Sequence, residues 1–383
     1  MPKIRLAWLQ LKREKSRMIV AMAGIAFSNI LMFMQLGFER ALYDSATRLH
    51  STLKADLIMI SPRSKSLAYM NSFPLRRLYQ ALGFDGVDSV SPLYVDFADW
   101  KNPITNNYRA IFVFGFKPEK PVFTLPEVNQ NLNKLKLPDT FLFDRYSRPE
   151  YGPIAAEFER NKQVVTEISN YRIKTVGLFS LGPSFAADGN LITSDQNFLR
   201  LFRNHRPGEI EIGLITLKSG VDNQKVLNNL VAQLPKDVKL LTYQGFINFE
   251  KDYWRTSTAI GFMFTLGTSM GFIVGIVIVY QILFTDVNEH LAEYATLKAM
   301  GFTDNYLLNV VFQEALILAI LGYIPGLGIS LALYELTKAA TSLPMLMSAS
   351  RSVLVFVLTI LMCAISGAIA VRKLRTADPA DIF

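Results

Sequence analysis

The sequence is poor in the residues that metal sites and many enzymes use. Its 383 residues include one cysteine and three histidines. Cys363 lies within an apolar run, so we expect neither a disulfide framework nor a thiolate metal site. His50, His205 and His290 lie far apart in the chain and show no metal-ligand spacing. The sequence therefore predicts no metal site.

Catalytic and nucleotide-binding motifs are also missing. The chain has no G-x-S-x-G turn, no H-E-x-x-H motif and no cysteine–histidine pairing, so we expect no enzymatic activity and no cofactor. The segment 177–184, GLFSLGPS, has the glycines of a phosphate-binding loop, but Pro183 stands where that loop needs lysine. Because proline offers phosphate neither a cation nor an N–H, this segment is predicted to be a turn. Any ATP chemistry then belongs to another chain.

The charge pattern favours a membrane protein over a nucleic-acid-binding protein. Half of the residues (50%) are hydrophobic, and the formal net charge is +8. The basic residues gather beside apolar runs, at 12–17 and 372–375, as the positive-inside rule describes for membrane proteins. We therefore expect contact with membrane lipid and none with nucleic acid.

Four uncharged runs are long enough to cross a bilayer, which takes about 20 helical residues. No small-residue cleavage site follows the first run, so it is predicted to be a retained helix rather than a signal peptide. The basic flanks place both termini in the cytoplasm. The predicted segments are an interfacial helix (1–17), transmembrane helix 1 with a stalk (18–53), a periplasmic α+β domain (54–244), a stalk with transmembrane helix 2 (245–285), a cytoplasmic connector (286–304), transmembrane helix 3 (305–334), a periplasmic turn (335–351), transmembrane helix 4 (352–371) and a cytoplasmic tail (372–383).

The long segment between the first two spans has the composition of a soluble domain. Strands mixed with a few helices predict an α+β fold, with the acidic side chains scattered over a solvated surface. The section 118–160, rich in proline and asparagine, is assigned to a second, looser subdomain. Strands are expected at 55–61, 87–97, 108–116, 190–194 and 209–217, and helices at 75–82 and 221–234.

Apolar residues at helical spacing continue past the spans on both sides of this domain. The two series are expected to pack together, so that the domain stands on two helical legs. They are Leu42, Ala46, Leu49 and Leu53 in the first leg, and Phe246, Phe249 and Tyr253 in the second.

Small residues and one carboxylate stand out within the predicted spans. Gly267, Gly271 and Gly275 form two overlapping G-x-x-x-G steps, which allow close helix packing either within one subunit or across a dimer. Glu314 lies inside the third span, and we expect it near the interface, in reach of water, rather than on an ion pathway.

The connector DVNEHLAEYATLKAMG, from Asp286 to Gly301, is the one sizeable charged segment in the last third of the chain. Asp286, Glu289 and Glu293 recur at helical spacing, which predicts a short amphipathic helix at the membrane surface. This pattern alone fits either a solvated turn or a contact element for another protein.

The order of these features resembles the MacB/FtsX-type permeases of ABC transporters, and is most similar to the DevC type of cyanobacterial exporters. The family connector typically reads E-I-G-I-R-R-A-V-G-A. In EYATLKAMGF, Glu293, Lys298 and Gly301 are in register with it, whereas Tyr294 and Ala295 depart from it. Further similar segments are Gln313-Glu314-Ala315, ITSDQNFLRLF at 192–202 and the ending DPADIF.

The resemblance implies the permease subunit of a mechanotransmitting tripartite efflux machine in the bacterial inner membrane. Such permeases are homodimers that work with an ABC ATPase, a membrane fusion (adaptor) protein and a TolC-like outer-membrane channel. The fused N-terminal ATPase of MacB is absent here, so a separate ATPase subunit is expected. The DevC type implies a glycolipid cargo. The residues expected to couple to the ATPase are Asp286, Glu289, Glu293, Lys298 and Gly301.

Two other functions stay open from the sequence. An FtsX-like relay would use ATPase closure to control a cell-wall hydrolase, and a membrane-anchored enzyme would act through the periplasmic domain. A co-purifying adaptor would indicate export, a hydrolase or its activator would indicate the relay, and turnover by the isolated domain would indicate the enzyme.

Overall fold

The computed structural model describes residues 8, 12, 13, 15–290, 292, 293, 296, 300, 301 and 303–376. The chain divides into two compact units. The first, here called the helical bundle, comprises residues up to Ala41 together with 259–341 and the chain from Met345 onward. The second, the inserted domain, comprises residues 42–258 with 342–344.

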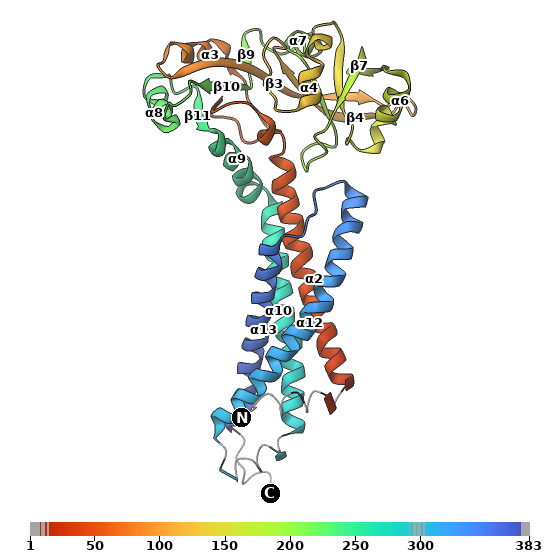
Figure 1. Ribbon diagram of the computed structural model, residues 1–383, viewed down its shortest axis with the longest axis vertical. Coiled ribbons are helices and arrows are strands. Elements are labelled where there is room, and N and C mark those ends of the chain that lie inside the picture. The colour runs from red at the N-terminus through yellow and green to blue at the C-terminus, as the bar shows by residue number, and fades with distance from the viewer. Residues whose placement is uncertain are drawn as a thin grey trace. The chain divides into compact units, whose positions relative to one another are not determined.

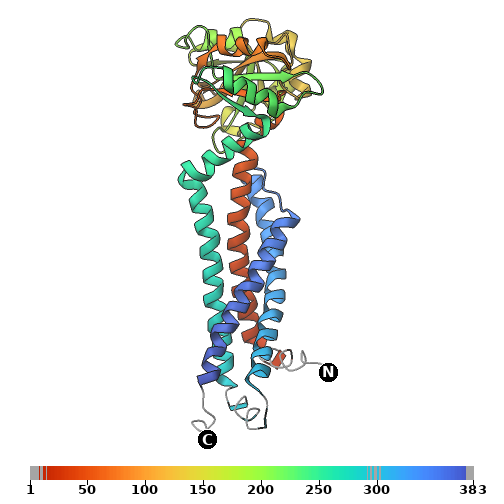
Figure 2. The same ribbon diagram turned by 90° about the vertical axis from the view of Figure 1, so that its left-hand side faces the viewer.

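Four long helices form the bundle, and Figure 1 and Figure 2 both show them side by side. Each is long and apolar enough to cross a membrane. Many of their large apolar side chains are exposed, among them Phe262 (66%) and Ile324 (62%), as expected for a surface that faces lipid. The predicted architecture, with four spanning helices and a domain inserted after the first, is confirmed. The helices are α2 (Lys15–Ala46), α10 (Ala259–Glu289), α12 (Asp304–Thr341) and α13 (Ala349–Thr376).

The three glycines of the G-x-x-x-G steps on α10 all face α2 of the same chain. A Cβ atom added at Gly267 would meet the end of the Gln35 side chain, and one added at Gly275 would meet Met362 Sδ of α13 first and Ser28 of α2 next. The Ser28 hydroxyl donates a hydrogen bond of 2.6 Å to the carbonyl oxygen of Gly271. Small residues thus bring the two backbones close enough for a side chain to bond the main chain of its neighbour.

Buried polar side chains provide further hydrogen bonds between the helices. The Thr359 hydroxyl on α13 lies 2.7 Å from Asn29 Oδ1 on α2, and the Ser366 hydroxyl donates to the Ile276 carbonyl of α10 at 2.8 Å. Since lipid tails offer no hydrogen-bond partners, these groups must be satisfied inside the bundle.

The inserted domain is built on one large mixed sheet. Within the described residues nine strands join in the order β11-β1-β10-β3-β4-β8-β5-β7-β6, with an additional contact between β3 and β6. Most neighbours are antiparallel, whereas β4–β8 and β5–β7 are parallel. The strands are β1 (Leu57–Ile60), β3 (Val87–Lys101), β4 (Tyr108–Phe116), β5 (Thr140–Asp144), β6 (Val164–Ile168), β7 (Tyr171–Phe179), β8 (Asn190–Ser194), β10 (Ile212–Leu217) and β11 (Lys239–Thr242).

Apolar residues cover both faces of this sheet. On β4, Ile111 and Val113 belong to one buried cluster, whereas Phe112 and Phe114 belong to another. Because alternate side chains of a strand point to opposite faces, the sheet is buried on both sides.

Short helices and a small two-stranded sheet complete the inserted domain. The Ser194 hydroxyl accepts from the Asn197 N–H at the start of α7, and the Asp222 carboxylate caps α8 in the same way. The remaining elements are η1 (His50–Thr52), β2 (Phe73–Pro74), α3 (Leu75–Gln80), η2 (Ala81–Gly83), α4 (Pro126–Gln130), α5 (Leu132–Leu135), η3 (Pro149–Tyr151), α6 (Ile154–Asn161), α7 (Asp195–Leu201), β9 (Glu209–Ile210), α8 (Asn223–Gln233), α9 (Tyr243–Asp252) and the π-helix η4 (Tyr253–Ser257).

The structure corrects the expectation of a second, looser subdomain at 118–160. β5 lies within that section and pairs with β7 and β8 inside the large sheet. The predicted first leg is also shorter as a helix, because α2 ends at Ala46. Leu49 lies in the turn before η1 and Leu53 directly after η1, and both share a buried cluster with Phe246 of α9.

We predict that replacing Gly326 by leucine destabilises the bundle. Gly326 on α12 faces α2, where an added Cβ would lie 3.2 Å from the Ala26 Cα. The larger side chain must displace α2, and overpacking of this kind costs about 1–3 kcal/mol. Thermal unfolding of the full chain in detergent measures the effect. Gly328→Leu on the same helix is the matched control, since nothing lies within 4 Å of a Cβ added there. Equal midpoints for the two variants would contradict the predicted role of the Gly326 contact.

Candidate functional site

The connector after α10 begins later than the sequence suggested. α10 continues to Glu289, so Asp286 and Glu289 lie on the last turns of a spanning helix rather than on a separate one. Val287, between them, is 1% exposed and packs inside the bundle. These positions are therefore fixed by the bundle.

Arg17, near the start of α2, binds both carboxylates. Its Nη2 lies 2.6 Å from Glu289 Oε2, and its Nη1 lies 3.6 Å from Asp286 Oδ1. The planar guanidinium can hold two carboxylates at once because its N–H groups point in several fixed directions. Asp286 and Glu289 thus join α10 to α2 within the chain. Opposite charges that flank two neighbouring spans were the available sequence signal for this contact.

The rest of the connector presents Glu293 and Gly301. Glu293 is helical and exposed. Gly301 has a φ of 92°, in the region that favours glycine, and nothing lies within 4 Å of a Cβ added there. The other predicted coupling residue, Lys298, lies outside the described residues, as do Leu291 and Tyr294. Glu293 is therefore the described acidic residue of the connector that is open to a partner.

Glu314 differs from its predicted environment. It is only 1% exposed within the bundle, so the expected access to water is not found. Its neighbour Ala315 belongs to the buried cluster of the bundle.

The glycine-containing segment 177–184 is held by a carboxylate of the same chain. Asp144 Oδ1 accepts from the Leu181 N–H at 3.1 Å, and its Oδ2 accepts from the Gly182 N–H at 2.7 Å. Asn190 Nδ2 also donates to Oδ2, at 2.8 Å. Backbone N–H groups that a phosphate-binding loop would turn toward phosphate are thus already bonded to Asp144.

A buried carboxylate and a buried imidazole meet where α9 approaches η1. Glu250 Oε2 accepts from the Leu67 N–H at 2.7 Å, and Glu250 Oε1 accepts from the Trp254 indole N–H at 2.8 Å. His50 Nε2 lies 3.6 Å from Glu250 Oε2, and the imidazole ring contacts the Phe246 ring in a tilted arrangement with centroids 4.4 Å apart. Neither nitrogen of His50 has a hydrogen-bond partner among the described residues. Glu250 therefore ties α9 to η4 and to the loop that carries Leu67.

Burial decides the protonation of this pair. It raises the pKa of Glu250 to about 7 and lowers the pKa of His50 to about 3, because the charged form of each loses its hydration. The 3.6 Å contact is therefore not an ion pair near neutral pH. The burial of Glu250 could have been inferred from the apolar face of α9, because Glu250 follows Phe246 by one helical turn. From the sequence, the acidic residues of this domain were instead expected on a solvated surface.

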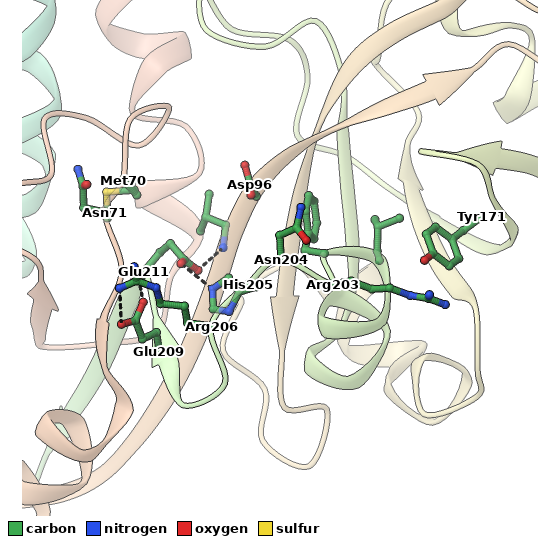
Figure 3. A pocket seen from close by; sticks show the side chains of 14 residues that line it. Met70, Asn71, Asp96, Tyr171, Arg203, Asn204, His205, Arg206, Glu209 and Glu211 are labelled. Carbon is green, nitrogen blue, oxygen red and sulfur yellow. Dashed lines mark hydrogen bonds and ion pairs between the residues drawn. The ribbon is translucent and has the colours of Figure 1, made fainter.

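A polar pocket of ≈ 670 Å³ lies elsewhere in the inserted domain (Figure 3). Its lining includes a largely buried pair, in which His205 Nε2 lies 2.8 Å from Glu211 Oε1. This hydrogen bond raises the pKa of His205. Beside it, the Arg203 guanidinium lies 5.0 Å from the centre of the Tyr171 ring. Among the described residues no three His, Cys, Asp or Glu side chains gather as a metal site would require.

Part of the helical bundle matches a known protein family. Residues 259–379, which contain α10, α12 and α13, match the FtsX-like permease C-terminal domain. Uncharacterized ABC transporter permeases from two strains of Mycobacterium tuberculosis are 21% identical over 237 residues, which is 62% of this chain and 62% of each relative. The chain is therefore similar to ABC transporter permeases, and the similarity spans less than two thirds of their length.

Two solved structures resemble part of the chain. The periplasmic region of MacB from Actinobacillus actinomycetemcomitans is 9% identical, with a TM-score of 0.35, over 51% of this chain and 92% of that one. The extracellular domain of the noncanonic ABC-type transporter YknZ from Gram-positive bacteria is 10% identical, with a TM-score of 0.35, over 49% of this chain and 100% of that one.

The pH dependence at Glu250 follows from both pKa shifts. The ordinary values are 4.5 for Glu and 6.5 for His. Because the pKa of Glu250 is raised, the free energy of unfolding falls as the pH rises from 4.5 to about 7. Because the pKa of His50 is lowered, the free energy of unfolding falls as the pH decreases from 6.5 to about 3. From pH 4.5 to 6.5 the two effects cancel, because folding moves one proton from His50 to Glu250.

We predict that the tryptophan fluorescence of the full chain titrates with a midpoint near pH 7, as Glu250 ionises beside the Trp254 indole. Glu250→Gln keeps the shape of the side chain but cannot ionise, so the transition should disappear. A flat wild-type curve between about pH 5 and 9, or a transition that persists in Glu250→Gln, would contradict this assignment.

Proposed function

We propose that this chain is the membrane subunit of an ABC-type efflux machine driven by a separate ATPase. The observation that carries the proposal is the match of residues 259–379 to the FtsX-like permease C-terminal domain. In the proposed machine two copies of the chain lie in the bacterial inner membrane, with their termini in the cytoplasm and the inserted domain in the periplasm. A lipid-like cargo, by resemblance a glycolipid, leaves the periplasm through an adaptor and a TolC-like channel.

The bundle is suited to transmit movement rather than to conduct cargo. Gly271 lets α10 bond α2 directly, and Gly326 lets α12 lie against the α2 backbone. Helices in such close contact shift together, because a packed interface cannot deform continuously. Closure of the ATPase at the connector would then move α2 and α10, the two helices that lead into the inserted domain.

Within the connector, Glu293 is the proposed contact for the ATPase, with Lys298 and Gly301 as further elements. Glu293 is exposed, whereas Asp286 and Glu289 are bonded to Arg17. We assign the latter two an indirect role: they fix the start of the connector on the bundle.

The same family match supports a second function. A relay of the FtsX kind would use the same movement to activate a cell-wall hydrolase, and nothing would be transported. Purification with partners distinguishes the two, because an adaptor protein supports export whereas a hydrolase or its activator supports the relay.

We predict that Glu293→Lys weakens ATPase binding without affecting insertion of the chain. An exposed ion pair contributes at most about 1 kcal/mol, so affinity should fall about two- to fivefold, with a matching loss of coupled transport. Affinity can be measured with the chain in nanodiscs and the purified ATPase. Asp286→Lys is a poorer probe, because it would also break the contact with Arg17.

The matched control for this change is Glu335→Lys. Glu335 lies near the other end of α12, and its side chain is 72% exposed. Its reversal should leave ATPase affinity unchanged. If Glu293→Lys binds the ATPase as tightly as the control does, the connector is only a solvated turn.

A further inference from the structure

One edge of β3 is open in the middle of the strand. β10 pairs with β3 as far as Leu93, and β6 pairs with it only at Trp100. No other strand among the described residues pairs with this edge between those two positions. The N–H and C=O groups of Val95, Phe97 and Asp99 face it, because alternate residues of a strand point their main-chain groups to the same edge. The Asp99 carbonyl already accepts from the Ser169 N–H at 2.8 Å, so the open part of the edge ends before it.

Side chains cap the N–H groups at this open edge. The Val95 N–H donates to buried Glu211 at 3.1 Å, and the Asp99 N–H donates to the Ser169 hydroxyl at 3.3 Å. The Phe97 N–H donates to the carboxylate of its own neighbour, Asp96, at 2.7 Å. The last cap is local and exposed, so a single side-chain rotation of Asp96 frees the Phe97 N–H.

The polar pocket of ≈ 670 Å³ lies along this edge, with both Val95 and Asp96 in its lining (Figure 3). Among the described residues, neither Asp96 nor Arg203 forms an ion pair: Asp96 interacts with His205 only through a weaker electrostatic attraction, and the Arg203 guanidinium lies over the Tyr171 ring. The other charges of the lining are matched, since Glu209 lies 3.7 Å from Arg206 and Glu211 bonds His205. The pocket thus offers, beside an open strand, a carboxylate and a guanidinium that form no ion pair.

We propose that this edge of β3 binds an extended peptide segment of a partner protein. The segment adds a short strand opposite Phe97, accepting from its N–H and donating to its carbonyl group. A basic side chain of the segment forms an ion pair with Asp96, whose hydrogen bond from the Phe97 N–H breaks when the peptide binds. An acidic side chain of the segment forms an ion pair with Arg203. The main-chain bonds supply affinity and the two charges supply selectivity, as in other cases of strand addition.

The exchange conserves hydrogen bonds. The Phe97 N–H donates to a peptide carbonyl instead of to Asp96. The Asp96 carboxylate then accepts from the basic side chain of the partner instead of from the Phe97 N–H. Strand edges that must stay free of partners are usually blocked by charge, proline or a covering segment. Here the blocking carboxylate is itself the complement of a basic side chain.

The proposal is tested with the full chain in detergent micelles and the probe peptide Val-Lys-Val-Glu-Val-amide, which carries fluorescein on its N-terminus through a glycine and is followed by fluorescence anisotropy. Two N-methylated isomers separate main-chain binding from charge. One carries methyl groups on the lysine and glutamate nitrogens, and the other carries them on the valine nitrogens, so each blocks one edge of the peptide strand. We expect one isomer to bind about tenfold more weakly and the other to bind like the parent peptide.

Substitutions in the chain test the charges. Asp96→Asn and Arg203→Gln should each lower the affinity for the parent peptide about two- to fivefold at low salt. Arg200→Gln, on α7 and paired with Asp139 outside the pocket, is the matched control and should leave the peptide affinity unchanged.

Equal binding of both methylated isomers would show recognition by charge alone and overturn the added strand. No binding of the parent peptide, or unchanged binding by both pocket variants, would overturn the site itself. None of these outcomes depends on whether the chain exports anything.

Discussion

The close contact of α2 with α10 and α12 is the constraint on which the bundle depends. Apolar side chains gain little by moving from lipid to protein, so membrane helices associate through close packing and hydrogen bonds. Gly271 and Gly326 provide the packing, and Ser28 adds a bond to the α10 main chain. Arg17 extends the same contact to the end of α10. Because α2 and α10 are the two helices that lead into the inserted domain, this contact also defines the proposed route of movement.

In the inserted domain, buried carboxylates join separate segments of the chain. Asp144 holds the 177–184 segment, Glu211 caps the open edge of β3, and Glu250 joins α9 to its surroundings. Each accepts main-chain N–H groups, which makes its burial tolerable and leaves a buried donor unsatisfied if it is removed. The domain therefore places its acidic residues where segments must be joined, not only on its surface.

Features encoded locally were predictable, and those that depend on distant partners were not. Uncharged runs predicted the four spans, and a strand-like segment between turn signals predicted β4 at residues 108–116. The proline-rich section around β5 suggested a separate subdomain, because nothing in it shows that β5 pairs in parallel with β7, which follows only after η3, α6 and β6. The helical spacing of Asp286 and Glu289 was correct, but nothing local shows that Arg17, 272 residues from Glu289, would bind them. Whether Glu250 faces water or the interior likewise depends on His50 and Leu67.

In the proposed machine a separate ATPase moves the inserted domain through the bundle, and one distance measurement tests this movement most directly. Cys363 is the only cysteine, so Cys363→Ala with Asn107→Cys gives a single spin-label site on an exposed loop of the inserted domain. In the reconstituted complex, the distance between the labels of two copies should change when ATP binds to the ATPase. An unchanged distance, while the ATPase is bound and hydrolyses ATP, would contradict the account.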